Sequence, residues 1–212
     1  DEIELSLALT VNPRTQPIVD GHVRCEGVRF RTSTMHPSEM FWRQLKFGEF
    51  DVSEMSVASL MIATSQAPTD WVAIPVFTMR HFFHTSILVR KDSGIEKPAD
   101  LKGKRVGVPE YQQTWAVWSR GILKDEFGIE PRDLIWHMER NPDKSHGGAT
   151  GFKPPDGVRF TYIPPETNMG EMMVNGGLDA TLLYMNAGNL IDRSTIDLEN
   201  HPGIRTLFPD LA

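Results

Sequence analysis

The chain has 212 residues, 40% of them hydrophobic, which suits one large domain or two lobes of about 100 residues each. A net charge of −6 argues against nucleic acid as a partner, and no segment approaches the roughly 20 apolar residues of a membrane-spanning helix. The single cysteine, Cys25, excludes an internal disulfide and zinc sites built from paired cysteines.

Strand and helix patterns alternate through the first 90 residues. Apolar and polar residues alternate over residues 3–10, a period of two that predicts a strand, and a short helical stretch then reaches the turn at Gly21. His36 and Pro37 open the helical sequence MFWRQLKFG, whose last glycine ends it, and Ser56 is placed to cap the apolar helix VASLMIAT. Further strands are predicted over residues 28–32, 50–55, 71–77 and 85–89.

The same alternation continues through the second half. A charged turn, ADLKGKR, leads into the apolar strand 105–108, and the polar loop EYQQT separates it from the amphipathic helix 114–127. Such a unit directs backbone N–H groups and the positive end of the helix dipole toward the loop, where a carboxylate is stabilised without a cofactor. Residues 139–157 lack periodicity and exceed the ~12–15 residues usual for an unstructured connection, which indicates a functional loop, a contact arm or disorder. The remaining elements are a helix over residues 168–175 and strands over residues 134–138, 158–163, 180–183 and 204–208.

Several long strings resemble the 4,5-dihydroxyphthalate decarboxylase family. They are LALTVNPRTQPI, HPSEMFWRQLKFGEFDVSEMS, PVFTMRHFFHTSILVR, GKRVGVPEYQQT and SHGGATGF with PPETNMGEM, and the match runs from about Leu7 to Pro209. The resemblance implies an α/β, two-lobed type 2 periplasmic-binding-protein-like fold, with mainly parallel sheets and an interlobe cleft. It also implies a carboxy-lyase of phthalate degradation that converts 4,5-dihydroxyphthalate to protocatechuate.

On this scaffold we expect a first lobe over residues 1–84 and a second over residues 85–190. Residues 191–212 would cross back toward a first lobe that stays incomplete. Decarboxylation of a hydroxylated aromatic acid needs cations for the carboxylates, a proton donor that works near neutral pH, and acceptors for the catechol. No organic cofactor is expected, because the protonated ring serves as the electron sink, and the use of a divalent metal is left open.

Two arginines and a histidine are the first candidates. Arg14, after the first strand, is expected to hold a carboxylate bidentately, the alternative being a surface arginine packed on a neighbouring proline. Arg80 and His81 lie at the expected crossover, but adjacent residues of an extended strand point in opposite directions, so both face one ligand only if the strand is broken. His81 and His84 have an HxxH spacing that could chelate a metal, and the alternative is a histidine satisfied by backbone bonds.

His36 is the first candidate acid, since imidazole titrates near neutral pH; its alternative role is to cap the helix that follows. Ser56 offers a hydroxyl at a helix start. The EYQQT loop supplies four more substrate-binding candidates: Glu110, Tyr111, Gln112 and Thr114. In this loop an acid is expected to accept a catechol proton or contact a metal, and the threonine with the loop N–H groups to hold a carboxylate.

The rival interpretation is a non-enzymatic solute-binding protein for a small aromatic carboxylate in an ABC-type uptake system. No secretory signal starts at Asp1, which together with the histidines and the family strings favours the enzyme and a cytoplasmic location. The expected partner is a small aromatic carboxylate, with no nucleic acid and no membrane span, and a homo-oligomer is left open.

Overall fold

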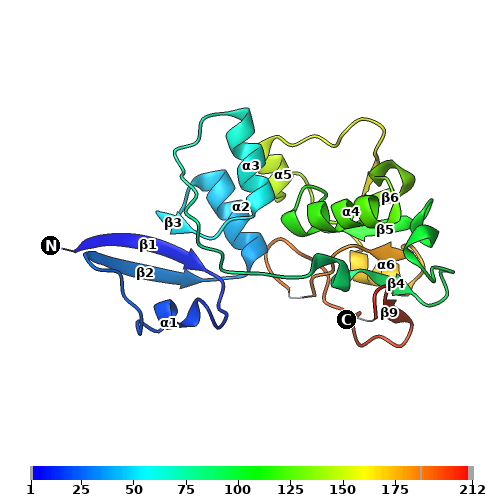
Figure 1. The fold of residues 1–212 in the computed structure, drawn as a ribbon, viewed down its shortest axis with the longest axis horizontal. Coiled ribbons are helices and arrows are strands. Elements are labelled where there is room, and N and C mark those ends of the chain that lie inside the picture. The colour runs from blue at the N-terminus through cyan, green and yellow to red at the C-terminus, as the bar shows by residue number, and fades with distance from the viewer. Residues whose placement is uncertain (1, 187, 210–212) are drawn as a thin grey trace. The chain divides into compact units, whose positions relative to one another are not determined.

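The computed structural model describes residues 2–186 and 188–209 (Figure 1). The chain divides into two compact units, with the boundary between Arg80 and His81 rather than after residue 84. Residues 191–209 group with the second unit. Within the described ranges, no helix combines the length and the apolar character needed to cross a membrane.

The first unit contains a three-stranded parallel sheet in the order β2-β1-β3. Its strands are β1 (Ile3–Leu9), β2 (Val28–Thr34) and β3 (Val52–Ser53), and its helices are α1 (Gln16–Val19), α2 (Pro37–Phe47) and α3 (Val57–Gln66). β1 and β2 lie side by side and pair in register along their whole lengths (Figure 1). Ala8 of the central strand packs with Met40 of α2 and with Phe50 to form a small core.

Two helix boundaries in the first unit follow the local chemistry that the sequence predicts. α2 ends at Gly48, whose φ of 59° is the left-handed conformation that glycine adopts at little cost. α3 begins after Ser56, whose side chain accepts a hydrogen bond from the backbone N–H of Ser59 at 3.4 Å. α2 follows β2 and α3 follows β3, so both helices start near the carboxyl ends of strands.

The predicted strand over residues 71–77 is wrong, because this segment is irregular in the structure. Its alternating residues Val72, Ile74 and Val76 are 90%, 65% and 66% exposed. These residue types favour a strand, but a strand also requires a hydrogen-bonded partner, and none of the described strands pairs with this segment. The predicted strand over residues 50–55 likewise shortens to the two residues of β3.

The second unit is built on a six-stranded sheet in the order β7-β6-β5-β8-β4-β9. The four neighbouring strands β7, β6, β5 and β8 pair in parallel, whereas β4 runs antiparallel to both β8 and β9. The expectation of mainly parallel sheets is thus confirmed. The strands are β4 (Leu88–Arg90), β5 (Arg105–Val108), β6 (Ile135–Met138), β7 (Arg159–Tyr162), β8 (Ala180–Thr181) and β9 (Ile204–Thr206).

Three α-helices connect these strands: α4 (Thr114–Phe127), α5 (His146–Thr150) and α6 (Met169–Val174). α4 has the predicted bounds, and α5 is an unpredicted helix inside the aperiodic stretch 139–157. Residues 83–86 form a 3₁₀ turn where the strand 85–89 was expected, so β4 begins only at Leu88.

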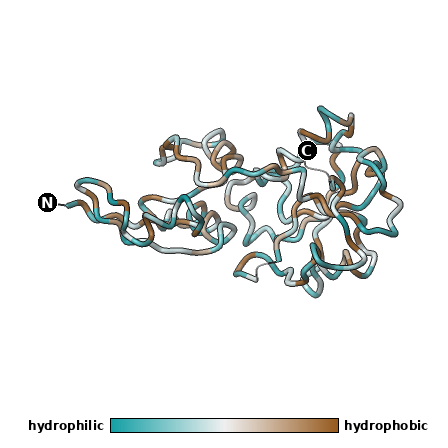
Figure 2. The backbone as a smooth tube through the Cα atoms, turned by 60° about the horizontal axis from the view of Figure 1, so that its bottom comes forward, coloured by the Kyte–Doolittle hydropathy of each residue, from teal (hydrophilic) through white to brown (hydrophobic). Residues whose placement is uncertain are grey.

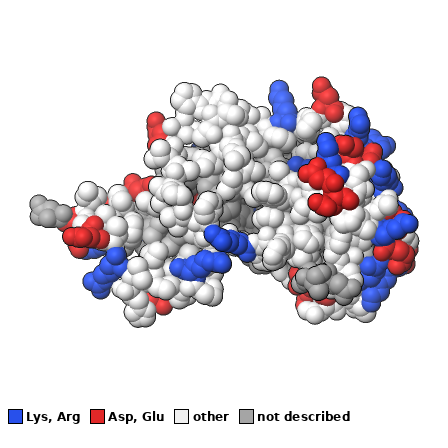
Figure 3. All heavy atoms as spheres, in the orientation of Figure 1, with Lys and Arg blue, Asp and Glu red and all other residues white. Residues whose placement is uncertain are grey.

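The core of the second unit lies on both faces of this sheet. Val106 and Val108 of β5 pack with Trp136 of β6 and with Leu123 of α4 in one buried cluster. Apolar segments gather in the middle of this unit, around its sheet (Figure 2). On its visible surface, acidic and basic side chains are intermixed (Figure 3). Such exposed pairs contribute little, about 0–1 kcal/mol each, so the apolar core supplies most of the stability.

Candidate functional site

In sheets with parallel strands, ligands bind beyond the carboxyl ends of the strands, where successive connections leave in opposite directions. In the first unit β1 lies between β2 and β3, so this switch point falls between β1 and β3. In the second unit the chain leaves β5 toward β6 and returns to the other side of β5 as β8, which places the switch point between β5 and β8. The loops after these four strands are the candidate ligand-binding positions.

The first unit brings three predicted site residues to one edge of its sheet. Arg14 follows β1, His36 follows β2 and Ser56 follows β3, and the three strands are neighbours. The Arg14 side chain is exposed, while its backbone N–H donates to Asn12 Oδ1 at 2.9 Å and fixes the turn that carries it. A cation, an imidazole and a hydroxyl thus share the edge where an anionic ligand is expected.

His36 occupies the N-cap of α2. Its Nδ1 accepts a hydrogen bond from the backbone N–H of Ser38 at 3.3 Å, so this nitrogen carries no proton in the capped form. The capping role foreseen as an alternative is therefore present. Any proton that His36 donates must come from Nε2, and protonation of Nδ1 would break the cap.

Glu54, which was not predicted from the sequence, lies between the ends of β1 and β3. It directly follows β3, and its carboxylate accepts hydrogen bonds from the Thr10 backbone N–H at 3.1 Å and the Thr10 hydroxyl at 2.8 Å. The Thr78 side chain also acts on the carboxyl group and lowers its pKa. Burial raises the pKa of Glu54 above its ordinary value, although these hydrogen bonds act in the opposite direction. An acid directly after a short strand, in the string DVSEMS, was the available signal.

In the second unit, Glu110 is completely buried rather than open to a ligand. Its Oε1 accepts from Arg140 Nη1 at 2.9 Å and from the His146 backbone N–H at 2.8 Å, and its Oε2 accepts from the Gly147 backbone N–H at 3.0 Å. Burial alone would raise the pKa of Glu110, but the charges of His146 and Arg140 and these hydrogen bonds lower it. Glu110 therefore stays ionised and ties three segments together.

Arg140 completes this buried network. Its Nε and Nη2 donate to Asp192 Oδ1 and Oδ2 at 2.6 and 3.1 Å, opposite the bond from Nη1 to Glu110. Burial opposes its charge, but the two carboxylates raise the pKa of Arg140 above the ordinary value. One guanidinium thus joins the loops that follow β5, β6 and β8 at the switch point.

The other EYQQT residues are divided between the interior and this edge. Tyr111 is buried against Trp136 and beneath the Arg120 guanidinium, which lies 3.6 Å from its ring centre. Gln112 is buried and donates to Glu110. Thr114 is the half-buried first residue of α4.

Gln113, not singled out from the sequence, forms the N-cap of α4. Its Oε1 is buried and has no hydrogen-bond partner in the part of the chain that the structure describes. Its Nε2 contacts Met185 Sδ at 3.9 Å, which places the side chain between the loops after β5 and β8. An unsatisfied acceptor at this position is suited to a hydroxyl or N–H donor from a ligand.

The crossover histidines of the second unit lie among aromatic rings. His81 is exposed and packs on Trp115, with ring centres 4.8 Å apart. The His84 ring packs edge-on against Phe208. Over residues 2–186 and 188–209, no three His, Cys, Asp or Glu side chains are grouped so that they could hold a metal ion. Arg80, the last residue of the first unit, is exposed.

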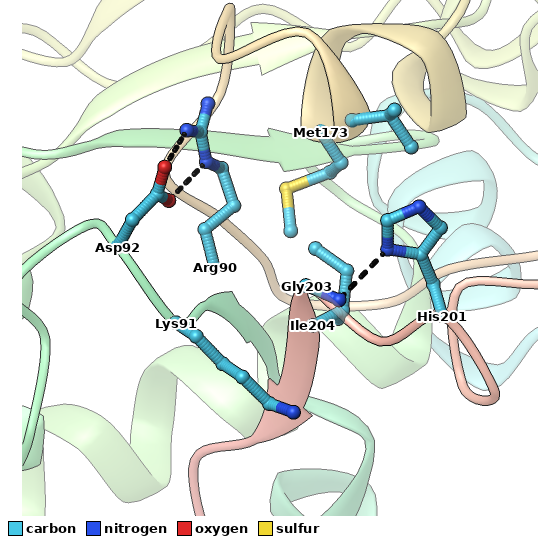
Figure 4. Close-up of a pocket in the computed structure, with 8 residues that line it drawn as sticks. Arg90, Lys91, Asp92, Met173, His201, Gly203 and Ile204 are labelled. Carbon is cyan, nitrogen blue, oxygen red and sulfur yellow. Dashed lines mark hydrogen bonds and ion pairs between the residues drawn. The ribbon is translucent and has the colours of Figure 1, made fainter.

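A pocket at β4 and β9 lies elsewhere in the second unit (Figure 4). Arg90 and His201 line it, and Arg90 is paired with Asp92 through Nε at 2.8 Å. The Arg90 backbone N–H donates to the carbonyl of Asp179, the residue before β8. The pocket therefore lies at the amino ends of the parallel strands, opposite to the edge where ligands bind in such sheets.

Comparisons with known proteins agree on one lineage. The family described as "ABC transporter, phosphonate, periplasmic substrate-binding protein" matches residues 20–149. A 4,5-dihydroxyphthalate decarboxylase of Comamonas testosteroni is 34% identical over 209 residues, which are 99% of this chain and 61% of that protein. A 4,5-dihydroxyphthalate decarboxylase of Pseudomonas putida is 36% identical over 182 residues, 86% of this chain and 70% of that protein. The chain therefore spans between three fifths and three quarters of the length of these relatives.

Solved structures support the same fold. The aliphatic sulphonate binding protein SsuA from Escherichia coli has a TM-score of 0.52 and 16% identity, over 85% of this chain and 54% of that one. SsuA from Xanthomonas axonopodis pv. citri, bound to MOPS, has a TM-score of 0.50 and 16% identity, over 87% and 55% of the two chains. Likeness at this identity concerns the fold alone. On the sequence identities, the chain belongs to the 4,5-dihydroxyphthalate decarboxylase family and has the fold of the periplasmic substrate-binding proteins.

Proposed function

We propose that the full-length protein catalyses the non-oxidative decarboxylation of 4,5-dihydroxyphthalate to protocatechuate. The observation that carries the proposal is the identity of 34% and 36% to two proteins of that name, over 99% and 86% of this chain. An enzyme acting on such a catabolic intermediate would work in the cytoplasm, which cell fractionation can test.

The reaction needs little besides positioning and one proton. A proton added to the ring carbon that bears the leaving carboxylate lets the hydroxyl para to it push electrons toward that carbon. The carbon–carboxylate bond then breaks, CO2 leaves, and its bonding electrons restore the aromatic ring. Cations that hold the two carboxylates and acceptors that hold the catechol hydroxyls keep the substrate aligned for this step.

The arginines at the end of the first unit and at its sheet edge suit the carboxylates. Arg14 and Arg80 are exposed, and neither forms an ion pair with another described residue, so both guanidinium groups are available for a bidentate contact. Ser56 would add a hydroxyl at the N-terminus of α3. We expect Arg14→Ala to weaken a phthalate-type ligand by about 2–5 kcal/mol, with Arg24→Ala, an exposed arginine of the same unit, as the unchanged control.

In the second unit, Thr114 and the backbone N–H groups at the start of α4 would bind a further acidic or hydroxyl group. Glu110, Tyr111 and Gln112 would act through the loop they hold in place, since all three side chains are buried. For the proton donor, His36 and His81 are the candidates from the sequence. His36→Asn separates its two roles, because asparagine caps a helix well but cannot act as an acid at neutral pH.

The second candidate function is a solute-binding protein for an aromatic carboxylate. It is favoured by the family description that matches residues 20–149 and by the likeness of the fold to sulphonate-binding proteins. One experiment separates the two. Purified full-length protein is incubated with 4,5-dihydroxyphthalate, with and without EDTA, and protocatechuate and CO2 are measured. We expect conversion without an added organic cofactor; tight binding in calorimetry with no CO2 over hours would refute the enzyme and support the binding protein.

A further inference from the structure

Glu54 is an acid at the switch point of the first unit's sheet, between β1 and β3. Its backbone N–H donates to the Ala8 carbonyl at 3.1 Å, so it prolongs the pairing of β3 with β1 by one residue. Its carboxyl group then bonds both the N–H and the hydroxyl of Thr10, the residue that follows β1. The side chain is thus fixed between the ends of the two strands where a ligand binds in such sheets.

The hydrogen bonds to the Glu54 carboxyl come from neutral groups of Thr10. Besides burial, Thr10 and the side chain of Thr78 act on its pKa. Burial dominates and raises the pKa of Glu54, so the carboxyl keeps its proton closer to neutral pH than an exposed glutamate does. The Thr78 contact also brings the segment that carries Arg80, two residues later, to this sheet edge.

The two histidines are less suited to deliver a proton here. Nδ1 of His36 is used by the helix cap, and charging the ring would break that cap. His81 is exposed, and its ring packs on Trp115. Glu54 is half-buried and is held by two hydrogen bonds from Thr10, which the ionised carboxylate still accepts after it has given up a proton.

We propose that Glu54 is the proton donor of the decarboxylation, an inference that rests on the proposed function. The Glu54 carboxyl group gives its proton to the ring carbon that bears the leaving carboxylate, and a C–H bond forms there. The bond from that carbon to the carboxylate then breaks, CO2 departs, and the electron pair returns to the ring. The Glu54 carboxylate regains a proton from water, so one proton is consumed for each CO2 released.

The test uses full-length protein with the variants Glu54→Gln and His36→Asn, and Glu49→Gln as the matched control. Glu49 is a glutamate of the same unit that pairs with Arg43 and precedes β3, so it lies at the opposite end of that strand from Glu54. Turnover of 4,5-dihydroxyphthalate is followed by the release of CO2. Binding is measured separately by calorimetry with phthalate, which lacks the reacting hydroxyls. Glutamine keeps the acceptor for Thr10 and the side-chain volume, so circular dichroism should show an unchanged fold.

For Glu54→Gln we expect kcat to fall by roughly 10²–10⁴-fold while the phthalate Kd stays within about 3-fold. The wild-type kcat should decrease as the pH rises through the Glu54 pKa, because only the protonated form acts, and residual activity of the variant should lack that step. Full activity of Glu54→Gln, or loss confined to His36→Asn, overturns this inference but leaves the proposed function standing. A wild-type protein that binds phthalate but releases no CO2 from 4,5-dihydroxyphthalate overturns both this inference and the proposed function.

Discussion

Replacing Arg140 by methionine is the sharpest test of what holds the second unit's sheet edge together. The Arg140 side chain is 0% exposed, and its carboxylate partners Glu110 and Asp192 are 0% and 1% exposed. Methionine fills much of the arginine volume but leaves two buried carboxylates without the positive charge of the guanidinium that lies between them. Breaking a buried ion pair from one side costs about 3–5 kcal/mol, a large part of the ~5–15 kcal/mol that stabilises a typical domain.

Urea unfolding followed by tryptophan fluorescence measures this loss, since Trp136 is buried in the same unit. In a thermal melt, at about 2–4 °C per kcal/mol for a protein of this size, the expected fall in Tm is about 6–20 °C. Lys102→Met is the control: its pair with Asp133 is exposed and should contribute less than about 1 kcal/mol. An Arg140→Met protein within 1 kcal/mol of wild type would refute the argument.

A second variant separates the effect of charge from that of lost packing. Adding Glu110→Gln and Asp192→Asn to Arg140→Met removes the two carboxylate charges but keeps nearly the same volume. If buried charge without the arginine causes the loss, the triple variant should regain part of the stability that Arg140→Met loses relative to wild type. A triple variant that is no more stable than Arg140→Met would assign the loss to packing instead.

Two further predictions concern the second unit. Gly107→Ala should cost about 1–3 kcal/mol in urea unfolding, because its Cβ would lie 2.7 Å from Leu178 Cδ1 and 2.8 Å from Met169 Cγ; an unchanged midpoint would show that these side chains move aside. Burial alone would raise the pKa of Asp179, but hydrogen bonds from Arg105 lower that pKa below its ordinary value of 3.8. The stability that Asp179 contributes is present above this ordinary value and is lost as the pH falls through the folded-state pKa. Asp179→Asn should therefore flatten the acid limb of a curve of stability against pH; curves that run parallel for wild type and variant would contradict this.

Local sequence chemistry predicted the elements whose ends depend on neighbouring residues. The stop at Gly48 and the cap at Ser56 follow from the backbone freedom of glycine and from a serine oxygen, both within one helical turn. The segment 71–77 failed because pairing depends on a distant partner strand, which no local pattern reveals. α5 was missed because its five residues, HGGAT, have weak helix propensity.

The candidate site divides in the same way. The placement of Arg14, His36 and Ser56 at one edge was predictable, because each lies in the connection that follows a strand and parallel strands end at one edge. The burial of Glu110 was not, because it depends on Arg140, 30 residues later in the chain, which in turn depends on Asp192, a further 52 residues on. A polar string such as EYQQT suggests a solvated loop until the partner of its acid is known.

The position of Arg140 between the carboxylates of Glu110 and Asp192 also restricts the order in which these three residues can be replaced during evolution. If Arg140 is replaced first, two like charges remain buried, and that intermediate is the least stable of the three single replacements. If Glu110 or Asp192 is neutralised first, the arginine keeps one partner and the remaining pair is electrically balanced. Descendants that exchange this network for apolar packing should therefore have lost an acid before they lost the arginine, and reconstructed ancestors would carry that half-dismantled pair.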